Sequence, residues 1–519
     1  MILDTLEFSN EYCLDLLMGH LATTIWIICY FGVLLGLAGY GLHRYSMIYL
    51  YWKHSRRKPE PNGCLDQLPH VTIQLPIFNE LYVVRRLIES VSKINYPKEL
   101  LQIQILDDST DETRKICAEE ESKLKAAGYD VELIQREDRE GFKAGALENG
   151  MHSAKGEYIY ILDADFVPGP EVLHQMIHFF TDERVGMIQT RWGHINRKYS
   201  ILTRVQALFL DGHHAVEQTA RSRSGRFFNF NCTAGIWRKS AIVDSGGWEH
   251  DTITEDLDLS YRAQMKGWKF IYLADVVTPA ELPPDMNGFK TQQHRWAKGS
   301  IQTCRKILGR VLRSDLPWII KFEAIAHLTA NFAYLLLILL CVLVNPAMHP
   351  ESGWVRTVLL DIPIFCATTI SVGLFYVTAQ IAINPSPLKW IREILYLPVL
   401  LAIGIGMSIN NGKAVLEAIL GKESDFVRTP KYGIEKKDKA FSQSKYRALK
   451  SVAPLFEILF FLYFSYLVIH AAANSNWFVL PFLVLFQLGF FIVAYGSLRH
   501  LLPNFLNGEG KSKDEPIKI

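Results

Sequence analysis

The chain has 519 residues, of which 49% are hydrophobic and 21% are charged. A chain of this length is too long for one ordinary hydrophobic core, and the mixture of apolar and charged residues indicates a soluble domain fused to membrane spans. The net charge of +2 gives no sign of a nucleic-acid partner, and the eight scattered cysteines, with no CxxC spacing, are interpreted as small buried residues in a reducing compartment.

The first long apolar run, Thr23–Leu42, is about as long as the ~20 residues that a membrane-spanning helix needs. The segment before it is acidic and lacks the positively charged region of a cleavable signal peptide. Basic residues follow the run between Arg44 and Lys58. The positive-inside tendency therefore predicts that the N-terminus lies outside and that the chain beyond Arg44 enters the cytosol.

The stretch from about residue 70 to about residue 316 has no spanning run and is predicted to be a soluble α/β domain. Its apolar runs alternate with polar stretches of helical pattern, of which Leu81–Lys93 is the first. The predicted strands are Val71–Phe78, Gln102–Leu106, Val131–Gln135, Tyr158–Leu162 and Val185–Gln189. This alternation favours a mostly parallel sheet with a nucleotide-type crevice at the carboxyl ends of its strands.

Apolar runs return after residue 316. They are Ile325–Val344, Ile362–Ile383, Ile394–Ile409, Leu455–Ile469 and Trp477–Tyr495. The stretch Asn410–Lys450 is rich in lysine and arginine and is therefore expected in the cytosol. The predicted units are an N-terminal helix with a basic segment (1–69), the α/β domain (70–316), a membrane region (317–506) and a disordered tail (507–519).

Asp163 and Asp165 follow directly on the predicted strand Tyr158–Leu162. In extended backbone, residues i and i+2 point to the same face, so both carboxylates are expected at one site. Two hard oxygen ligands at the carboxyl end of a strand suit Mg²⁺ or Mn²⁺ bridging a diphosphate. A solvated turn is the alternative, because a lone Asp-x-Asp is common by chance.

Two further acidic motifs lie where the chain is expected to reach the crevice. Asp107 and Asp108 end a predicted strand, where they could recognise a nucleoside or serve as a helix N-cap. Thr254 is a plausible N-cap that would place Asp256 in the first helical turn, where the helix dipole favours an ionised carboxylate. Such a carboxylate could act as a general base, although acidic residues are also routine in first turns.

Gln292, Arg295 and Trp296 fall at positions i, i+3 and i+4 of a predicted helix and therefore share one face. An arginine can hold a diphosphate, and a tryptophan offers a flat apolar surface to a sugar ring. The alternative is an amphipathic helix at the membrane surface, where both residue types are usual.

In chain order, these motifs form the series Asp-Asp, Asp-x-Asp, Thr-Glu-Asp and Gln-x-x-Arg-Trp. The series resembles that of the processive, inverting family-2 glycosyltransferases of the cellulose synthase superfamily. The segments Gly141–Met151, Phe228–Arg238, Gly246–Arg262 and Gln292–Gly299 are especially similar to the plant cellulose-synthase-like A and C groups, which make mannan or glucomannan and xyloglucan backbones. The resemblance spans nearly the whole chain and implies a GT-A-like domain inserted between transmembrane helices.

The resemblance also implies a role for each matching residue. The nucleotide-sugar would be bound by Pro76, Asn79, Glu80, Asp107, Asp108, Lys143, Asp163, Gln292 and Arg295. A divalent cation, Mg²⁺ or Mn²⁺, would be held by Asp163 and Asp165, and the acceptor by Thr233, Ala234, Gly235 and Trp296. Asp256 would be the catalytic base.

A segment in the basic stretch, Phe426 to Lys431, is similar to the family's gating loop, which closes over the nucleotide. Phe426, Thr429 and Lys431 match that loop, whereas Arg428 stands where the family has valine. This departure leaves the loop's contacts open. The alternative is a basic juxtamembrane loop on an anionic leaflet.

The function that the resemblance implies is one-step, inverting transfer of a hexose from a nucleotide-sugar to a growing β-linked polysaccharide, with translocation across the membrane. UDP-glucose, GDP-mannose and UDP-N-acetylglucosamine stay open as donors. The plasma membrane or the Golgi membrane is the expected location. The alternatives are a non-processive transferase that adds one sugar to a lipid, and a catalytically silent scaffold or export subunit. The intact motifs disfavour the silent subunit, and the apolar runs after Gln-x-x-Arg-Trp disfavour the single transfer.

The run Ile394–Ile409 is predicted to lie flat at the membrane surface. If the α/β domain and the gating segment are both cytosolic, an even number of crossings must separate them, yet three apolar runs do. Ile394–Ile409 is the shortest of the three and contains Pro398, Gly404 and Gly406. Five crossings are therefore expected in all.

Overall fold

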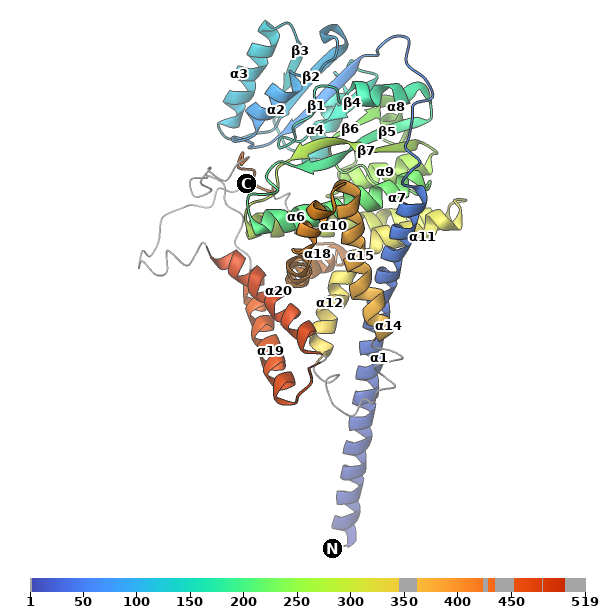
Figure 1. The fold of residues 1–519 in the computed structure, drawn as a ribbon, viewed down its shortest axis with the longest axis vertical. Coiled ribbons are helices and arrows are strands. Elements are labelled where there is room, and N and C mark those ends of the chain that lie inside the picture. Colours follow the sequence, from blue (N-terminus) through green and yellow to red (C-terminus); the bar gives the residue numbers. More distant parts are fainter. Residues whose placement is uncertain (1, 345–361, 423–427, 435–451, 478, 500–519) are drawn as a thin grey trace, which may run out of the picture.

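The computed structural model describes residues 2–344, 362–422, 428–434, 452–477 and 479–499. A domain built on one sheet lies at one end of the molecule, and a group of apolar helices lies at the other (Figure 1). The predicted tail 507–519 and the residue Phe426 lie outside the described residues.

The sheet has seven strands in the order β3-β2-β1-β4-β6-β5-β7. The strands are β1 Val71–Ile77, β2 Leu101–Asp107, β3 Asp130–Ile134, β4 Tyr158–Ile161, β5 Val185–His194, β6 Gly235–Arg238 and β7 Lys269–Ala280. All neighbours are parallel except β6, which is antiparallel to both β4 and β5. The mostly parallel sheet predicted from the sequence is therefore confirmed.

The five predicted strands correspond to β1–β5, and β5 continues to His194. β6 and β7 were not predicted. β6 is only four residues long, and β7 mixes charged and apolar residues without strict alternation. Short strands between two neighbours gain their stability from pairing and burial, which a local pattern does not reveal.

Helices cover both faces of the sheet and bury its apolar side chains. The helices of this domain are α2 Val84–Val91, α3 Thr113–Ala126, α4 Phe142–Met151, α5 His174–Ile177, α8 Lys239–Asp244 and α9 Glu255–Met265. Helices α6 Ile201–Asp211, α7 Gln218–Arg223 and α10 Met286–Arg313 lie between the sheet and the apolar helices (Figure 1). A π-helical stretch, η3 Gly212–Glu217, joins α6 to α7.

Four helical segments are long and apolar enough to cross a membrane: Thr24–His54 within α1 (Ile2–His54), Cys366–Ile383, α19 Ala453–Ala473 and α20 Leu480–Leu498. The segment Cys366–Ile383 comprises a π-helical stretch and α15 Ser371–Ile383, and α14 Ile362–Phe365 precedes it. Two further pairs pass the same test only as bent pairs, so the described residues offer four spans, or up to six.

The apolar run Ile325–Val344 is not one straight helix. It is divided between α11 Trp318–Thr329 and α12 Phe332–Leu343, which meet at 57°. The Thr329 hydroxyl donates to the Ile325 carbonyl one turn back, and Asn331 precedes α12. Hydroxyl bonds of this kind bend helices. The second bent pair joins α16 Pro387–Ile394 and α17 Leu397–Gly406 to α18 Ser408–Ile419 at 42°.

Candidate active site

A cavity opens where β1, β2 and β4 end, and α10 and the segment 428–434 form its other walls. The sequence-predicted residues that line it are Pro76, Glu80, Asp108, Lys143, Asp163, Asp165, Gln292, Arg295, Trp296, Thr429 and Lys431. Those that lie behind its wall are Asn79, Asp107, Thr233, Ala234, Gly235 and Asp256. The structure thus brings all four motifs to one place.

Asp107 and Asp108 end β2 and point to different partners. Asp107 is buried and accepts hydrogen bonds from the Ser109 backbone N–H (3.0 Å) and from Gln135 Nε2 (3.0 Å). Asp108 faces the cavity and is paired through both oxygens with Arg136. Neither residue caps a helix, because α3 begins only at Thr113, so the N-cap alternative is wrong.

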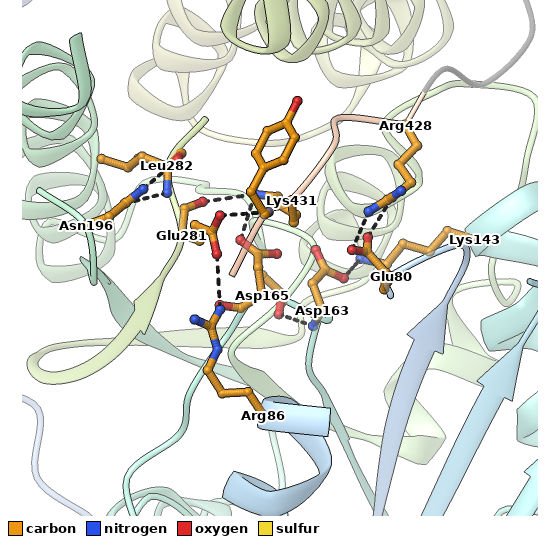
Figure 2. A network of polar contacts seen from close by, with 12 residues as sticks. Glu80, Arg86, Lys143, Asp163, Asp165, Asn196, Glu281, Leu282, Arg428 and Lys431 are labelled. Atoms are coloured by element: carbon orange, nitrogen blue, oxygen red, sulfur yellow. Dashed lines mark hydrogen bonds and ion pairs between the residues drawn. The ribbon is translucent and has the colours of Figure 1, made fainter. Parts of the chain in front are cut away.

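Asp163 and Asp165 follow β4, and each carboxylate is paired with a lysine ammonium (Figure 2). Lys143 Nζ contacts Asp163 Oδ1 and donates to the Cys232 carbonyl at 2.9 Å. Lys431 Nζ lies 2.7 Å from Asp165 Oδ2. Asp165 is 7% exposed, so the solvated-turn alternative is wrong for this residue. Two hard oxygen donors on one cavity wall fit Mg²⁺ or Mn²⁺.

Another acidic group, formed by Glu249, Asp251 and Asp258, is close enough to hold a cation. The ammonium group of Lys306, however, already occupies the position between these carboxylates. Its Nζ contacts a Glu249 oxygen and lies 2.6 Å from Asp251 Oδ1 and 3.1 Å from Asp258 Oδ1. This group is therefore a salt-bridge cluster that joins α9 to α10.

Helix α9 begins at Glu255, as predicted, with Thr254 at the N-cap position. The Thr254 side chain does not cap the helix; its hydroxyl lies 3.1 Å from that of Thr303 on α10. Thr254 and Glu255 line the cavity, while Asp256 is 4% exposed just behind them. Burial raises the pKa of Asp256, and the adjacent Asp256 charge adds to the burial that raises the pKa of Glu255.

Gln292, Arg295 and Trp296 lie on the face of α10 that lines the cavity, so they do not merely coat a membrane surface. The ring of Trp296 lies 6.4 Å from that of Trp192, centroid to centroid. Trp192 and His194 are alternate residues of β5 that also line the cavity. Sequence analysis missed both, because the predicted strand ended at Gln189.

The segment 428–434 crosses the cavity and contacts three acidic residues (Figure 2). Arg428 pairs with Glu80, and the Lys431 ammonium donates to the Glu281 carbonyl at 3.0 Å as well as to Asp165. The Tyr432 backbone N–H donates to Glu281 Oε1 at 2.9 Å. Thr429 and Lys431 are buried, so the described part of this segment is not a solvated juxtamembrane loop.

Backbone strain gathers around the cavity. Of the five non-glycine residues with positive φ among the described residues, Asn79, Phe142, Cys232 and Ala234 surround it. Asn79 Oδ1 accepts from the Thr110 backbone N–H at 2.8 Å, and the Thr233 hydroxyl accepts from the Asp163 N–H at 2.8 Å. The hydrogen bonds of Asn79 and Thr233 therefore hold the loops that carry Asp108 and Asp163. Strained backbone of this kind is frequent at functional sites.

Comparisons with known proteins agree with this geometry. The model of glycosyl transferase family 2 matches residues 72–242, and that of glycosyl transferase family group 2 matches residues 158–348. Glucomannan 4-beta-mannosyltransferase 7 of Arabidopsis thaliana is 30% identical over 488 residues, which cover 88% of this chain and 84% of the relative. Glucomannan 4-beta-mannosyltransferase 1 of Oryza sativa subsp. japonica is 35% identical over 403 residues, covering 74% and 73%.

Among solved structures, mannosyltransferase PcManGT from Pyrobaculum calidifontis, in complex with GDP-Man and Mn²⁺, superposes with a TM-score of 0.52. It covers 76% of this chain and 99% of its own, at 18% sequence identity. A likeness at this identity shows a shared fold.

Proposed function

This chain belongs to glycosyl transferase family 2 and is a glycosyltransferase with a GT-A-like fold. We propose that it transfers mannose from GDP-mannose to a growing β-linked glycan. One observation carries the proposal: residues from four distant motifs meet in a single cavity at the carboxyl ends of the strands. Mannose is proposed because the relatives named above are mannosyltransferases, and GDP because GDP-Man is bound in the solved structure that shares the fold.

The donor would lie with its nucleoside beside Pro76, Glu80 and Asp108. Its diphosphate would then reach Lys143, Arg295 and Lys431, whose cationic groups surround the same cavity. Positive side chains bind phosphate oxygens through charge-assisted hydrogen bonds. A divalent cation held by Asp163 and Asp165 would neutralise the charge that develops on the leaving diphosphate.

Asp256 is the proposed base. Its carboxylate would take the proton from the acceptor hydroxyl while the acceptor oxygen attacks the anomeric carbon and the nucleoside diphosphate leaves. The sugar of the acceptor would stack on Trp296. The site has one proposed base and no assigned nucleophile, which implies inversion, so an α-linked donor gives a β-linkage.

Processive growth and export are proposed from the position of α10. This helix carries Gln292, Arg295 and Trp296 and also contacts α18 and α20. A product that leaves the cavity past Trp296 would meet the apolar helices. The α/β domain and segment 428–434 would then be cytosolic, on the evidence of the basic residues between Arg44 and Lys58.

The test is to incubate membranes that contain the protein with labelled GDP-mannose, UDP-glucose or UDP-N-acetylglucosamine in turn. We expect a polymer from GDP-mannose that a β-mannanase degrades. A labelled polymer from another donor would refute the mannose assignment, and a single sugar on an extracted lipid would refute processive synthesis. Absence of transfer and of donor hydrolysis with every donor would support the silent subunit.

A further inference from the structure

The contact between Arg428 and Glu80 bears on how the donor cavity is closed, and the inference rests on the proposed function. We propose that this ion pair is a latch that holds residues 428–434 over the cavity before any donor has bound. Arg428 would thus act as a positioning residue, because it fixes Lys431 beside the place where the diphosphate is to lie.

The two side chains form a two-point contact across 348 residues of sequence. Arg428 Nε donates to Glu80 Oε1 at 2.9 Å, and Arg428 Nη2 donates to Glu80 Oε2 at 2.5 Å. The side chains are 10% and 13% exposed, so solvent screens their attraction little. A paired fork of this kind fixes orientation as well as distance, which a valine at residue 428 could not do.

The Glu80 carboxylate is largely buried, so a positively charged partner stabilises its ionised form. Burial raises the pKa of Glu80 to about 7, and the nearby charge of Asp165 works in the same direction. Among the residues that the structure describes, Arg428 is the ion-pair partner of Glu80. Opening the segment would separate the pair and leave a largely buried carboxylate without its counter-charge, which is unfavourable.

The C-terminal part of the segment, Tyr432 and Gly433, also packs closely against the α/β domain. Gly433 has φ +67°, and a Cβ added there would lie 2.8 Å from the carbonyl oxygen of Tyr82, which belongs to the same loop as Glu80. The Tyr432 N–H is bonded to Glu281. Contacts within the protein therefore define the closed position.

The two cationic residues of the segment would behave differently when a donor arrives. Lys431 contacts Asp165, one of the carboxylates proposed to hold the cation, so that contact competes with cation binding. Arg428 pairs with Glu80, which is not one of the carboxylates proposed to hold the cation. The latch can persist while Lys431 exchanges Asp165 for the donor diphosphate.

The experiment compares the purified full-length protein with Arg428→Val, Arg428→Lys and the control Arg85→Val. Arg85 pairs with Glu119 and Glu120 on α3 and lies outside the cavity lining, so the control also removes an arginine that pairs with a buried carboxylate in the same domain. Hydrogen exchange of the backbone amides in 428–434 is measured without nucleotide. Association and dissociation of fluorescent GDP and UDP are measured by stopped flow.

We expect the amide of Tyr432 to exchange roughly tenfold or more faster in Arg428→Val than in the wild type and the control. Nucleotide association and dissociation should both accelerate, because a segment that is closed beforehand slows entry and release alike. Arg428→Lys should be intermediate, since it keeps the charge but loses the fork.

Exchange in Arg428→Val equal to that of the control would overturn the latch. So would faster dissociation with unchanged association, because closure would then follow donor binding. A wild-type protein that bound neither GDP nor UDP would instead count against the proposed function, and the nucleotide-free hydrogen exchange would still decide the latch.

Discussion

Asp256 is buried behind the cavity wall, next to a carboxylate that faces the cavity. We expect Asp256→Asn to lower transfer by about 10²–10⁴-fold, because a general base acts in the transition state. Affinity for the nucleotide should stay nearly unchanged, since the side chain is not needed to hold the donor. Transfer and nucleotide binding should be measured on the same preparation, with the exposed Asp66→Asn as control. Substantial transfer by a folded Asp256→Asn protein would remove Asp256 from the role of base.

The two raised pKa values predict how transfer depends on pH. Asp256 must be ionised to accept a proton, so transfer is present at high pH and is lost as the pH falls through its raised pKa. Glu255→Gln should keep this acidic limb, because burial is what raises the pKa of Asp256, whereas the Asp256 charge acts on Glu255. A Glu255→Gln protein without an acidic limb would assign the limb to Glu255 instead of Asp256.

Asp165 is predicted to make turnover depend on a divalent cation. A chelator should stop transfer, and Mn²⁺ or Mg²⁺ should restore it in the wild type. Asp165→Ala should stay inactive in excess cation, because one of the two proposed ligands is gone. Calorimetric titration of Mn²⁺ in the presence of GDP gives a second readout that does not need the reaction. Full activity in chelator would refute the role of the cation.

Local sequence located the motif residues that line the cavity but not their partners. Asp108, Asp163 and Trp296 stand in recognisable motifs at predicted element ends. Their partners Arg136, Lys143 and Trp192 come from other elements, and only Lys143 was named, through the family resemblance. The sequence also does not reveal that Asp107 turns inward while Asp108 faces the cavity, because neighbouring residues at a strand end diverge according to the loop that follows.

At the scale of elements, strands with strong apolar runs were predictable and those that depend on neighbours were not. β2 is buried along its whole length and β1 everywhere except Pro76, and their apolar residues alternate with polar ones in the two-residue period of a strand. β6 has four residues between β4 and β5, and its direction is opposite to theirs. The bend between α11 and α12 was also missed, because its bond from Thr329 to Ile325 lies inside an apolar stretch.

The Lys306 cluster yields a prediction about how α9 is held. Removing the ammonium leaves Glu249, Asp251 and the fully buried Asp258 close together without the cation that contacts all three, although Arg262 still pairs with Glu249 and Asp258. We expect Lys306→Met to destabilise the protein by about 2–3 kcal/mol, seen as a lower thermal midpoint in detergent. The exposed Lys115→Met on α3 is the control. A Lys306→Met protein that bound Mn²⁺ and regained the wild-type midpoint would show that a cation can replace the lysine.

At the scale of the whole molecule, α10 couples the cavity to the apolar helices. Lys290 Nζ lies 2.5 Å from Glu457 Oε1 of α19 and 3.2 Å from Ser497 Oγ of α20. Asn410 of α18 donates to the Lys290 carbonyl at 2.9 Å. The helix that carries Trp296 is therefore fastened to three helices of the C-terminal half, an arrangement that no local pattern predicts because the partners are more than 100 residues apart.

These contacts also bear on the predicted path of Ile394–Ile409. Upstream of this stretch, Glu393 of α16 pairs with Arg197 of the α/β domain at 3.1 Å. Downstream of it, Glu417 of α18 lies 3.4 Å from Lys298 of α10. Both flanks thus contact the same side of the molecule, although α17 between them is apolar and α17 and α18 meet at a bend.

We therefore keep the prediction that 394–409 does not cross the membrane, so that the chain makes five crossings in all. Lys389 and Lys422 are exposed on the two flanks, and a cysteine placed at either should react with an impermeant maleimide from the cytosolic side alone. The experiment uses sealed vesicles of known orientation and a background in which the native cysteines are replaced. Labelling of the two positions from opposite sides would show that the segment spans the membrane. Segment 428–434 contacts Glu80 and Asp165 of the α/β domain, so the two must lie on the same side of the membrane. Labelling from opposite sides would therefore also contradict the cytosolic position of the α/β domain or of this segment.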